Sequence, residues 1–144
     1  MDKRVKKQPA PTTLYLADGS VVSGTIFLAG QSARHSGPET VGELLTDPSP
    51  MLRFKLGADR FQLIGKTGIA AARTVSGTRP PGFYANVHAT MTMWGGHRFE
   101  GQLLVEEGHD RVSDAVNEPW LRVESQGGLV WANRNLILKL ETRS

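Results

Sequence analysis

The side chains best suited to bind an anion stand at two short turns. Lys66 follows Gly65 in the first turn, and Arg134 stands between Asn133 and Asn135 in the second. A cation with amide donors beside it can bind a phosphate or a carboxylate. The same residue types are also ordinary turn formers. Both interpretations, an anion site and a pair of plain turns, therefore stay open for these residues.

Two arginines and one tryptophan are further candidate contacts. Arg53 and Arg122 each stand among apolar residues of an expected strand. Their guanidinium groups could contact a shared ligand. Alternatively, each side chain packs its apolar stem on the barrel and forms an ion pair with its charged end. Trp94 falls at an expected hairpin tip. An exposed Trp94 would anchor a partner protein or stack on a nucleic-acid base. We expect it instead to fold back onto the core, where Trp120 and Trp131 also belong.

No set of residues that could carry catalysis is visible in the sequence. The four histidines lack the spacing of metal ligands, and the absence of cysteine excludes disulfides and thiolate metal sites. There is also no acid–base pair and no nucleophile set. We therefore expect a protein that is not an enzyme and that uses no cofactor and no metal.

The basic residues that could attract a nucleic acid are concentrated at the N-terminus. Beyond residues 1–11 the chain has no net charge: residues 12–81 carry a net +2 and residues 82–144 a net −2. A protein that holds a phosphate backbone usually has a basic face. Only the tail is basic. It could contact a nucleic acid or another anionic surface, or it could simply be a solvated chain end. Its cations are Lys3, Arg4, Lys6 and Lys7.

The elements that would position these residues occur twice. Three segments of the first half align in order with three of the second, and the length differences fall in polar connections. Such an internal repeat predicts two copies of one small unit. The aligned segments are 14–28 with 91–105, 77 residues apart, 50–55 with 119–124, 69 apart, and 61–69 with 129–137, 68 apart.

Each repeat predicts five short strands. Apolar and polar residues alternate along the strands, and Asp18 with Gly19 makes a tight hairpin turn. Gly24 and Gly101 occupy the same mid-strand position, which favours a sharp bend. Each repeat also has room for one helical turn, at 39–45 and 111–116. The expected fold is all-β, with two tandem five-stranded barrels packed together.

These patterns divide the chain into four parts. Charge and proline indicate a disordered tail over 1–11. The two barrel repeats then cover 12–74 and 84–144. Glycine and proline indicate a linker over 75–83 between them.

Segments of the two repeats resemble the Sm-like family of small SH3-like barrels. Residues 16–26 are similar to the first family motif, and residues 64–69 and 132–137 occupy the place of the second. The resemblance implies the barrel fold and assembly through strand edges. The Arg-Gly pair of the second family motif is replaced by Gly65-Lys66 and by Asn133-Arg134. The family's RNA pocket is therefore not carried over to this chain.

We expect a binding or assembly module that acts through barrel edges and turns and that associates with itself or with another protein. The opposite net charges of the two halves predict head-to-tail association that weakens with salt. The alternative is a regulator that binds single-stranded RNA through the basic tail, Lys66, Arg134 and an aromatic side chain. No run of 18 apolar residues and no signal peptide occurs, so we expect no membrane contact and a cytoplasmic location.

Overall fold

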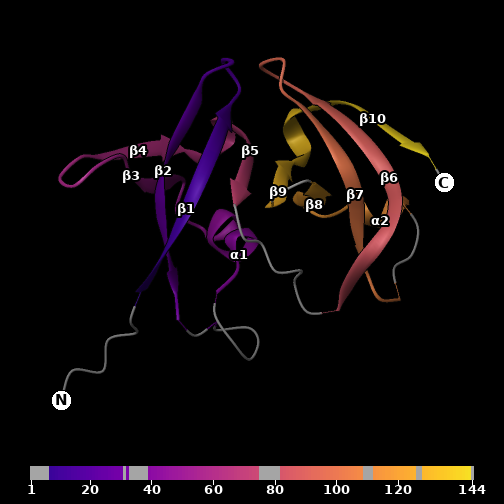
Figure 1. The fold of residues 1–144 in the computed structure, drawn as a ribbon, viewed down its shortest axis with the longest axis horizontal. Helices are drawn as coiled ribbons and strands as arrows, with labels where there is room; N and C mark the ends of the chain where they lie inside the picture. Colours follow the sequence, from indigo (N-terminus) through magenta and orange to yellow (C-terminus); the bar gives the residue numbers. More distant parts are fainter. Residues whose placement is uncertain are drawn as a thin grey trace.

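The computed structural model describes residues 7–30, 32, 39–74, 82–108, 112–125 and 128–143. Ten strands and two short helices make up this part of the chain (Figure 1). The strands are β1 Lys7–Leu16, β2 Val21–Ala29, β3 Met51–Lys55, β4 Phe61–Gly65, β5 Ile69–Thr74, β6 Phe83–Met93, β7 Arg98–Glu106, β8 Trp120–Ser125, β9 Gly128–Asn133 and β10 Ile137–Arg143. The helices are α1 Val41–Thr46 and α2 Val112–Ala115, and the 3₁₀ turns are η1 Lys66–Gly68 and η2 Arg134–Leu136.

All ten strands belong to one antiparallel sheet, which confirms the all-β prediction. Its order is β10-β6-β7-β8-β9-β5-β1-β2-β3-β4, so each half of the chain contributes five neighbouring strands. The two halves meet where β9 pairs with β5, and Figure 1 shows them as two lobes. The sheet is open: within the described residues no pairing joins β4 to β5 or β9 to β10. The two ends of the sheet are therefore β10 and β4.

The two halves repeat the same local hydrogen bonds. The Leu16 amide donates to the Ser20 carbonyl, and 77 residues later the Met93 amide donates to that of His97. The amides of Ala17 and Trp94 likewise donate to the carbonyls of Gly68 and Leu136, both at 2.8 Å. Each half thus ties its first hairpin turn to its own 3₁₀ turn in the same way.

Gly24 and Gly101 have the same physical reason to be glycine. A Cβ on Gly24 would overlap the Lys55 carbonyl oxygen, and one on Gly101 would overlap that of Glu124. These two carbonyls lie at matching positions of β3 and β8, which pair with β2 and β7 at the residues that follow the two glycines. Any other residue would separate the paired strands.

The structure differs from the sequence expectation at the start of the first half. β1 begins at Lys7, inside the segment expected to be a disordered tail, and Lys7 pairs with Ala29. Prolines are tolerated there because the described pairing of β5 with β1 begins only at Thr12, so no described strand lies along one side of residues 7–11. The tail residues Lys3, Arg4 and Lys6 and most of the expected linker lie outside the described residues.

The core extends across both halves. One buried cluster combines Leu14 and Phe54 of the first half with Leu129 and Trp131 of the second. The other joins Ala70 and Ala71 to strands of the second half. Trp120 and Trp131 are both buried, as the sequence predicts. The halves therefore stabilise each other by sharing apolar surface, which units of this size need.

Candidate interface at the two ends of the sheet

The junction between the halves, here called the joint, is a strand pairing with large side chains on one face. Ala72 of β5 pairs with Trp131 of β9, and Thr74 pairs with Leu129. Trp131 is 3% exposed and Leu129 is 2% exposed. The Trp131 ring lies against α1 of the first half, where a Cβ on Gly42 would stand 2.5 Å from it. The joint therefore combines backbone pairing with apolar burial.

Asn133 connects the two halves by a hydrogen bond. Its Nδ2 donates to the Ile69 carbonyl at 3.0 Å, and its Oδ1 accepts from the Asn135 amide at 3.0 Å. Asn133 is buried. One of the residues predicted to bind a ligand thus holds the joint together, with both ends of its amide hydrogen-bonded.

The two first hairpins of the halves also touch at their tips. His97 Nε2 donates to the Leu16 carbonyl at 2.8 Å, which fixes the imidazole tautomer because a carbonyl only accepts. Tyr15 packs edge-on against the rings of His97 and Phe99. Gly95, with φ at 92°, stands so close to the Leu16 carbonyl that a Cβ there would collide with it. This tip contact is a second part of the joint.

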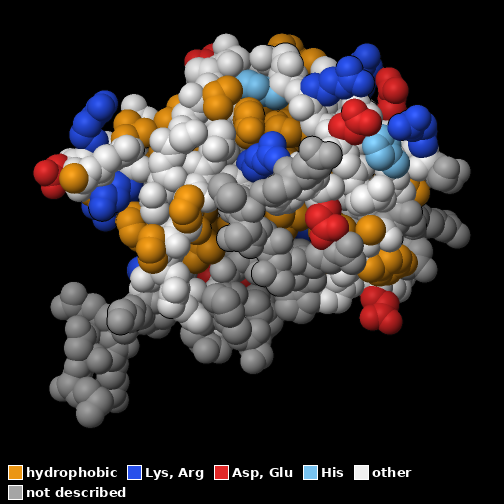
Figure 2. All heavy atoms as spheres, viewed as in Figure 1, with side chains coloured by type: hydrophobic (Ala, Val, Ile, Leu, Met, Phe, Trp, Pro, Cys, Tyr) orange, Lys and Arg blue, Asp and Glu red, His pale blue; other side chains and the backbone are white. Residues whose placement is uncertain are grey.

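The β4 end of the sheet exposes the residues that match the buried ones of the joint. Met51, Phe61 and Leu63 are 41%, 43% and 67% exposed, and they lie on one face of the β3–β4 hairpin because Met51 pairs with Gly65 and Arg53 with Leu63. Their counterparts in the sequence repeat are Trp120, Leu129 and Trp131, all buried in the joint. In Figure 2 hydrophobic and basic side chains lie together at this end, on the left.

The β10 end exposes two large apolar side chains. Leu138 is 52% exposed, although its counterpart in the first half, Ala70, is fully buried in the joint. Trp94, at the tip of the β6–β7 hairpin, is 54% exposed. The expectation that Trp94 folds back over the core is therefore wrong, because its side chain is exposed at the turn where its amide donates to the Leu136 carbonyl.

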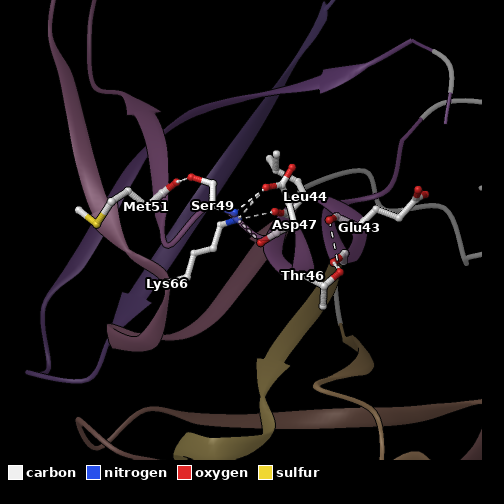
Figure 3. A network of polar contacts seen from close by, with 8 residues as sticks. Glu43, Leu44, Thr46, Asp47, Ser49, Met51 and Lys66 are labelled. Carbon is white, nitrogen blue, oxygen red and sulfur yellow. Dashed lines mark hydrogen bonds and ion pairs between the residues drawn. The ribbon is translucent and has the colours of Figure 1, made fainter. Parts of the chain in front are cut away.

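Lys66 is not an exposed turn cation. It is 8% exposed, and its Nζ donates to the carbonyls of Leu44 at 2.9 Å and Asp47 at 3.1 Å, with the Asp47 carboxylate 3.9 Å away (Figure 3). The ammonium thus binds carbonyls at the C-terminal end of α1, a stabilising arrangement for a short helix. Its counterpart Arg134 is exposed and donates to the Asn117 carbonyl at 2.8 Å, just after α2. The two residues serve matching local contacts rather than one shared anion site.

The two arginines at matching positions have different surroundings. Arg53 is exposed, with its guanidinium 4.1 Å from the centre of the Phe61 ring. Arg122 lies 4.0 Å over the Phe83 ring, and its Nη2 is 3.9 Å from the Glu118 carboxylate. Burial lowers the pKa of Arg122. Arg122 thus shows the packed stem and the ion pair that the sequence favours, whereas Arg53 is available at the β4 end.

A shallow cavity of about 260 Å³ lies beside α2. Its lining mixes apolar and charged side chains, and Arg122 forms part of it. Within the described residues no group of histidine and carboxylate side chains is placed to hold a metal ion, and no helix is long and apolar enough to cross a membrane. The lining residues are Phe83, Leu104, Val105, Glu106, Asp114, Ala115, Asn117, Glu118 and Arg122.

Comparison of the chain with protein families, curated proteins and solved structures finds no match. The site is therefore interpreted from its own geometry. Sequence reasoning did not single out Met51, Phe61, Leu63 and Leu138, because apolar residues on a strand carry no sign of which strand ends the sheet. The only signal available was the repeat itself, which pairs each of these positions with one in the other half.

Proposed function

We propose that this chain is a non-enzymatic assembly module that binds protein through the open ends of its sheet. One observation carries the proposal: Phe61 and Leu63 are exposed on a terminal strand, whereas Leu129 and Trp131, at the matching positions, are buried in the joint. An edge strand with exposed apolar residues is a template for pairing with another strand. A solvated end would be expected to carry charges instead.

The chemistry of the β4 edge favours an extended polypeptide as the ligand. Among the residues that the structure describes, no strand lies on the outer side of β4, so its amides and carbonyls can add one strand. Phe61 and Leu63 lie on one face of β4, so they can pack against every second side chain of the added strand. Arg53 beside Phe61 adds a cation that favours an acidic residue on the partner.

The proposal includes the view that each half is a small barrel of the Sm-like type. The support is the strand order, β5-β1-β2-β3-β4 in one half and β10-β6-β7-β8-β9 in the other, which is the same order for corresponding strands. The matching hydrogen bonds at the first hairpin turns and the matching close approaches at Gly24 and Gly101 support it further. A duplicated unit of this kind is suited to assembly through its strand edges.

The test is binding of a strand to the β4 edge. The probe is a fluorescein-labelled synthetic peptide with the sequence of residues 136–143, and the readout is fluorescence anisotropy against a scrambled peptide. We expect saturable binding that Leu63→Lys weakens about tenfold or more. The matched control is Gln102→Lys on the inner strand β7, where an exposed residue changes without touching either end. Equal binding by the three proteins, or none, would overturn the proposal.

A further inference from the structure

We propose that the cavity beside α2 binds a small zwitterion, an α-amino acid with an apolar side chain. This site lies away from the two sheet ends, so the inference is independent of the proposed function. Its central residue is Arg122 of β8, which forms part of the lining of the cavity of about 260 Å³. Pockets that hold drug-sized ligands usually measure about 300–1,000 Å³. The volume therefore favours a ligand smaller than these.

The guanidinium of Arg122 is mostly buried, yet it makes no hydrogen bond to the described part of the chain. Its Nη2 lies 3.9 Å from the Glu118 carboxylate, which is an ion pair at a distance too long for a hydrogen bond. Its Nε is fully buried and has no acceptor among the described residues. A guanidinium has N–H donors on all three nitrogens, and their burial without acceptors is costly. Arg122 is thus placed to receive an acceptor from a ligand.

Two aromatic rings hold the Arg122 side chain in position. The guanidinium carbon lies 4.0 Å from the centre of the Phe83 ring and 5.6 Å from that of the Trp131 ring. Arg122 also pairs with Leu104 of β7 and with Trp131 of β9, so its backbone lies between two neighbouring strands. A side chain held in this way loses little freedom when it binds. The planar guanidinium is then suited to a carboxylate, which it can bind through two parallel hydrogen bonds.

The other charges of the lining are negative. Three carboxylates, those of Glu106, Asp114 and Glu118, stand with the single guanidinium of Arg122. A ligand that is only an anion would be repelled by the three carboxylates. A ligand that is only a cation would be repelled by Arg122 and would leave its donors without an acceptor. A ligand with one group of each sign is attracted by both, which is the charge pattern of an amino acid.

The burial of these side chains predicts how the ligand would lie. The side chain of Arg122 is 15% exposed, that of Glu118 is 39% exposed, and Glu106 is exposed. The ligand's carboxylate would therefore point inward to Arg122, and its ammonium would lie near the mouth of the cavity, beside the acidic residues. The apolar part of the lining would contact the ligand's side chain; it consists of Phe83, Leu104, Val105 and Ala115.

Isothermal titration calorimetry of the full chain tests the ligand class. The probes are L-valine, L-leucine and L-phenylalanine, with glycine as the control that has both charges but no side chain. We expect at least one of the three to bind saturably and glycine to show no binding. Two analogues of the tightest probe, an amine without the carboxylate and a carboxylic acid without the ammonium, should each bind about tenfold more weakly or worse.

Substitution of Arg122 tests the residue. Arg122→Gln should weaken binding about ten- to hundredfold, because it removes hydrogen bonds to a charged group. The matched control is Arg53→Gln at the same position of the first half, where the guanidinium is exposed; this variant should bind like the unmodified chain. Arg122→Lys, which keeps the charge but loses the planar fork, should also weaken binding and serves if Arg122→Gln does not fold.

NMR of the ¹⁵N-labelled chain tests the location. The indole N–H signal of Trp131 should shift when the tightest probe is added, because the Trp131 ring lies beside Arg122. The signal of Trp94, at the exposed hairpin tip, should not shift. Absence of binding by all three amino acids would overturn the proposal, and equal binding by either analogue would overturn the zwitterion. Unchanged binding by the Arg122 variants, or a shift of Trp94 alone, would overturn the site.

Discussion

Trp131 of the second half lies against Gly42 of the first half, and a single added carbon at Gly42 would stand 2.5 Å from the Trp131 ring. Trp131 is 3% exposed and belongs to the buried cluster that both halves share. The smallest residue of α1 thus faces the largest residue of β9. The halves are fitted to one another at this point.

Gly42→Ala should destabilise the whole chain. The added methyl group would force the Trp131 ring out of its position, and overpacking of this kind costs about 1–3 kcal/mol. The measurement is the free energy of unfolding in urea. Gly57→Ala is the control, because a Cβ at Gly57 meets nothing within 4 Å. Equal stability of the two variants would contradict the fitted joint.

Lys66→Ala should lower stability, in contrast to a change at an exposed turn. The substitution leaves the carbonyls of Leu44 and Asp47 without their donor in a half-buried setting, a loss of about 1–3 kcal/mol. Arg134→Ala, at the exposed counterpart, should cost less in the same thermal or urea unfolding experiment. A Lys66 variant of full stability that loses binding to labelled single-stranded RNA would instead support the anion-site interpretation.

Asp18 should titrate below its ordinary range. The Ser20 hydroxyl donates to Asp18 Oδ1 at 2.6 Å and the Ser20 amide at 2.9 Å, and these bonds to the charged form lower the pKa of Asp18. Because the pKa is lower in the folded state, the contribution of Asp18 to stability is present above the unfolded pKa and is lost as the pH falls through the folded pKa. Ser20→Ala should raise the Asp18 pKa, as measured by NMR titration of the carboxyl carbon. Thr13→Ala, which removes only a hydroxyl contact to Ser23, should leave it unchanged.

The sequence predicted the all-β class and the repeat because both depend on local patterns: alternation, turn residues and spacing. It could not predict which apolar strands are covered. Leu63 and Trp131 are both large, apolar and similarly placed, yet one is 67% exposed and the other 3%, because only β9 has β5 beside it. Likewise Lys66 has the composition of an exposed turn, and its burial depends on α1, 20 residues earlier, folding over it. Long-range neighbours decided both outcomes.

Gly65→Asn should strengthen binding of the 136–143 peptide to the β4 edge. Gly65 is the counterpart of Asn133, whose amide joins the halves through the Ile69 carbonyl, and an asparagine at 65 could donate to the matching Ile137 carbonyl of the peptide. The backbone at Gly65 has a φ of −64°, and a Cβ there meets only the Met51 sulfur at 3.9 Å, so the substitution needs no rearrangement. One added hydrogen bond of about 0.5–1.5 kcal/mol predicts roughly a two- to tenfold lower dissociation constant for the peptide by fluorescence anisotropy. Gly57→Asn, in the β3–β4 turn, is the control for a general effect of asparagine. A dissociation constant that Gly65→Asn leaves unchanged, or raises, would mean that a strand bound at the β4 edge does not repeat the joint.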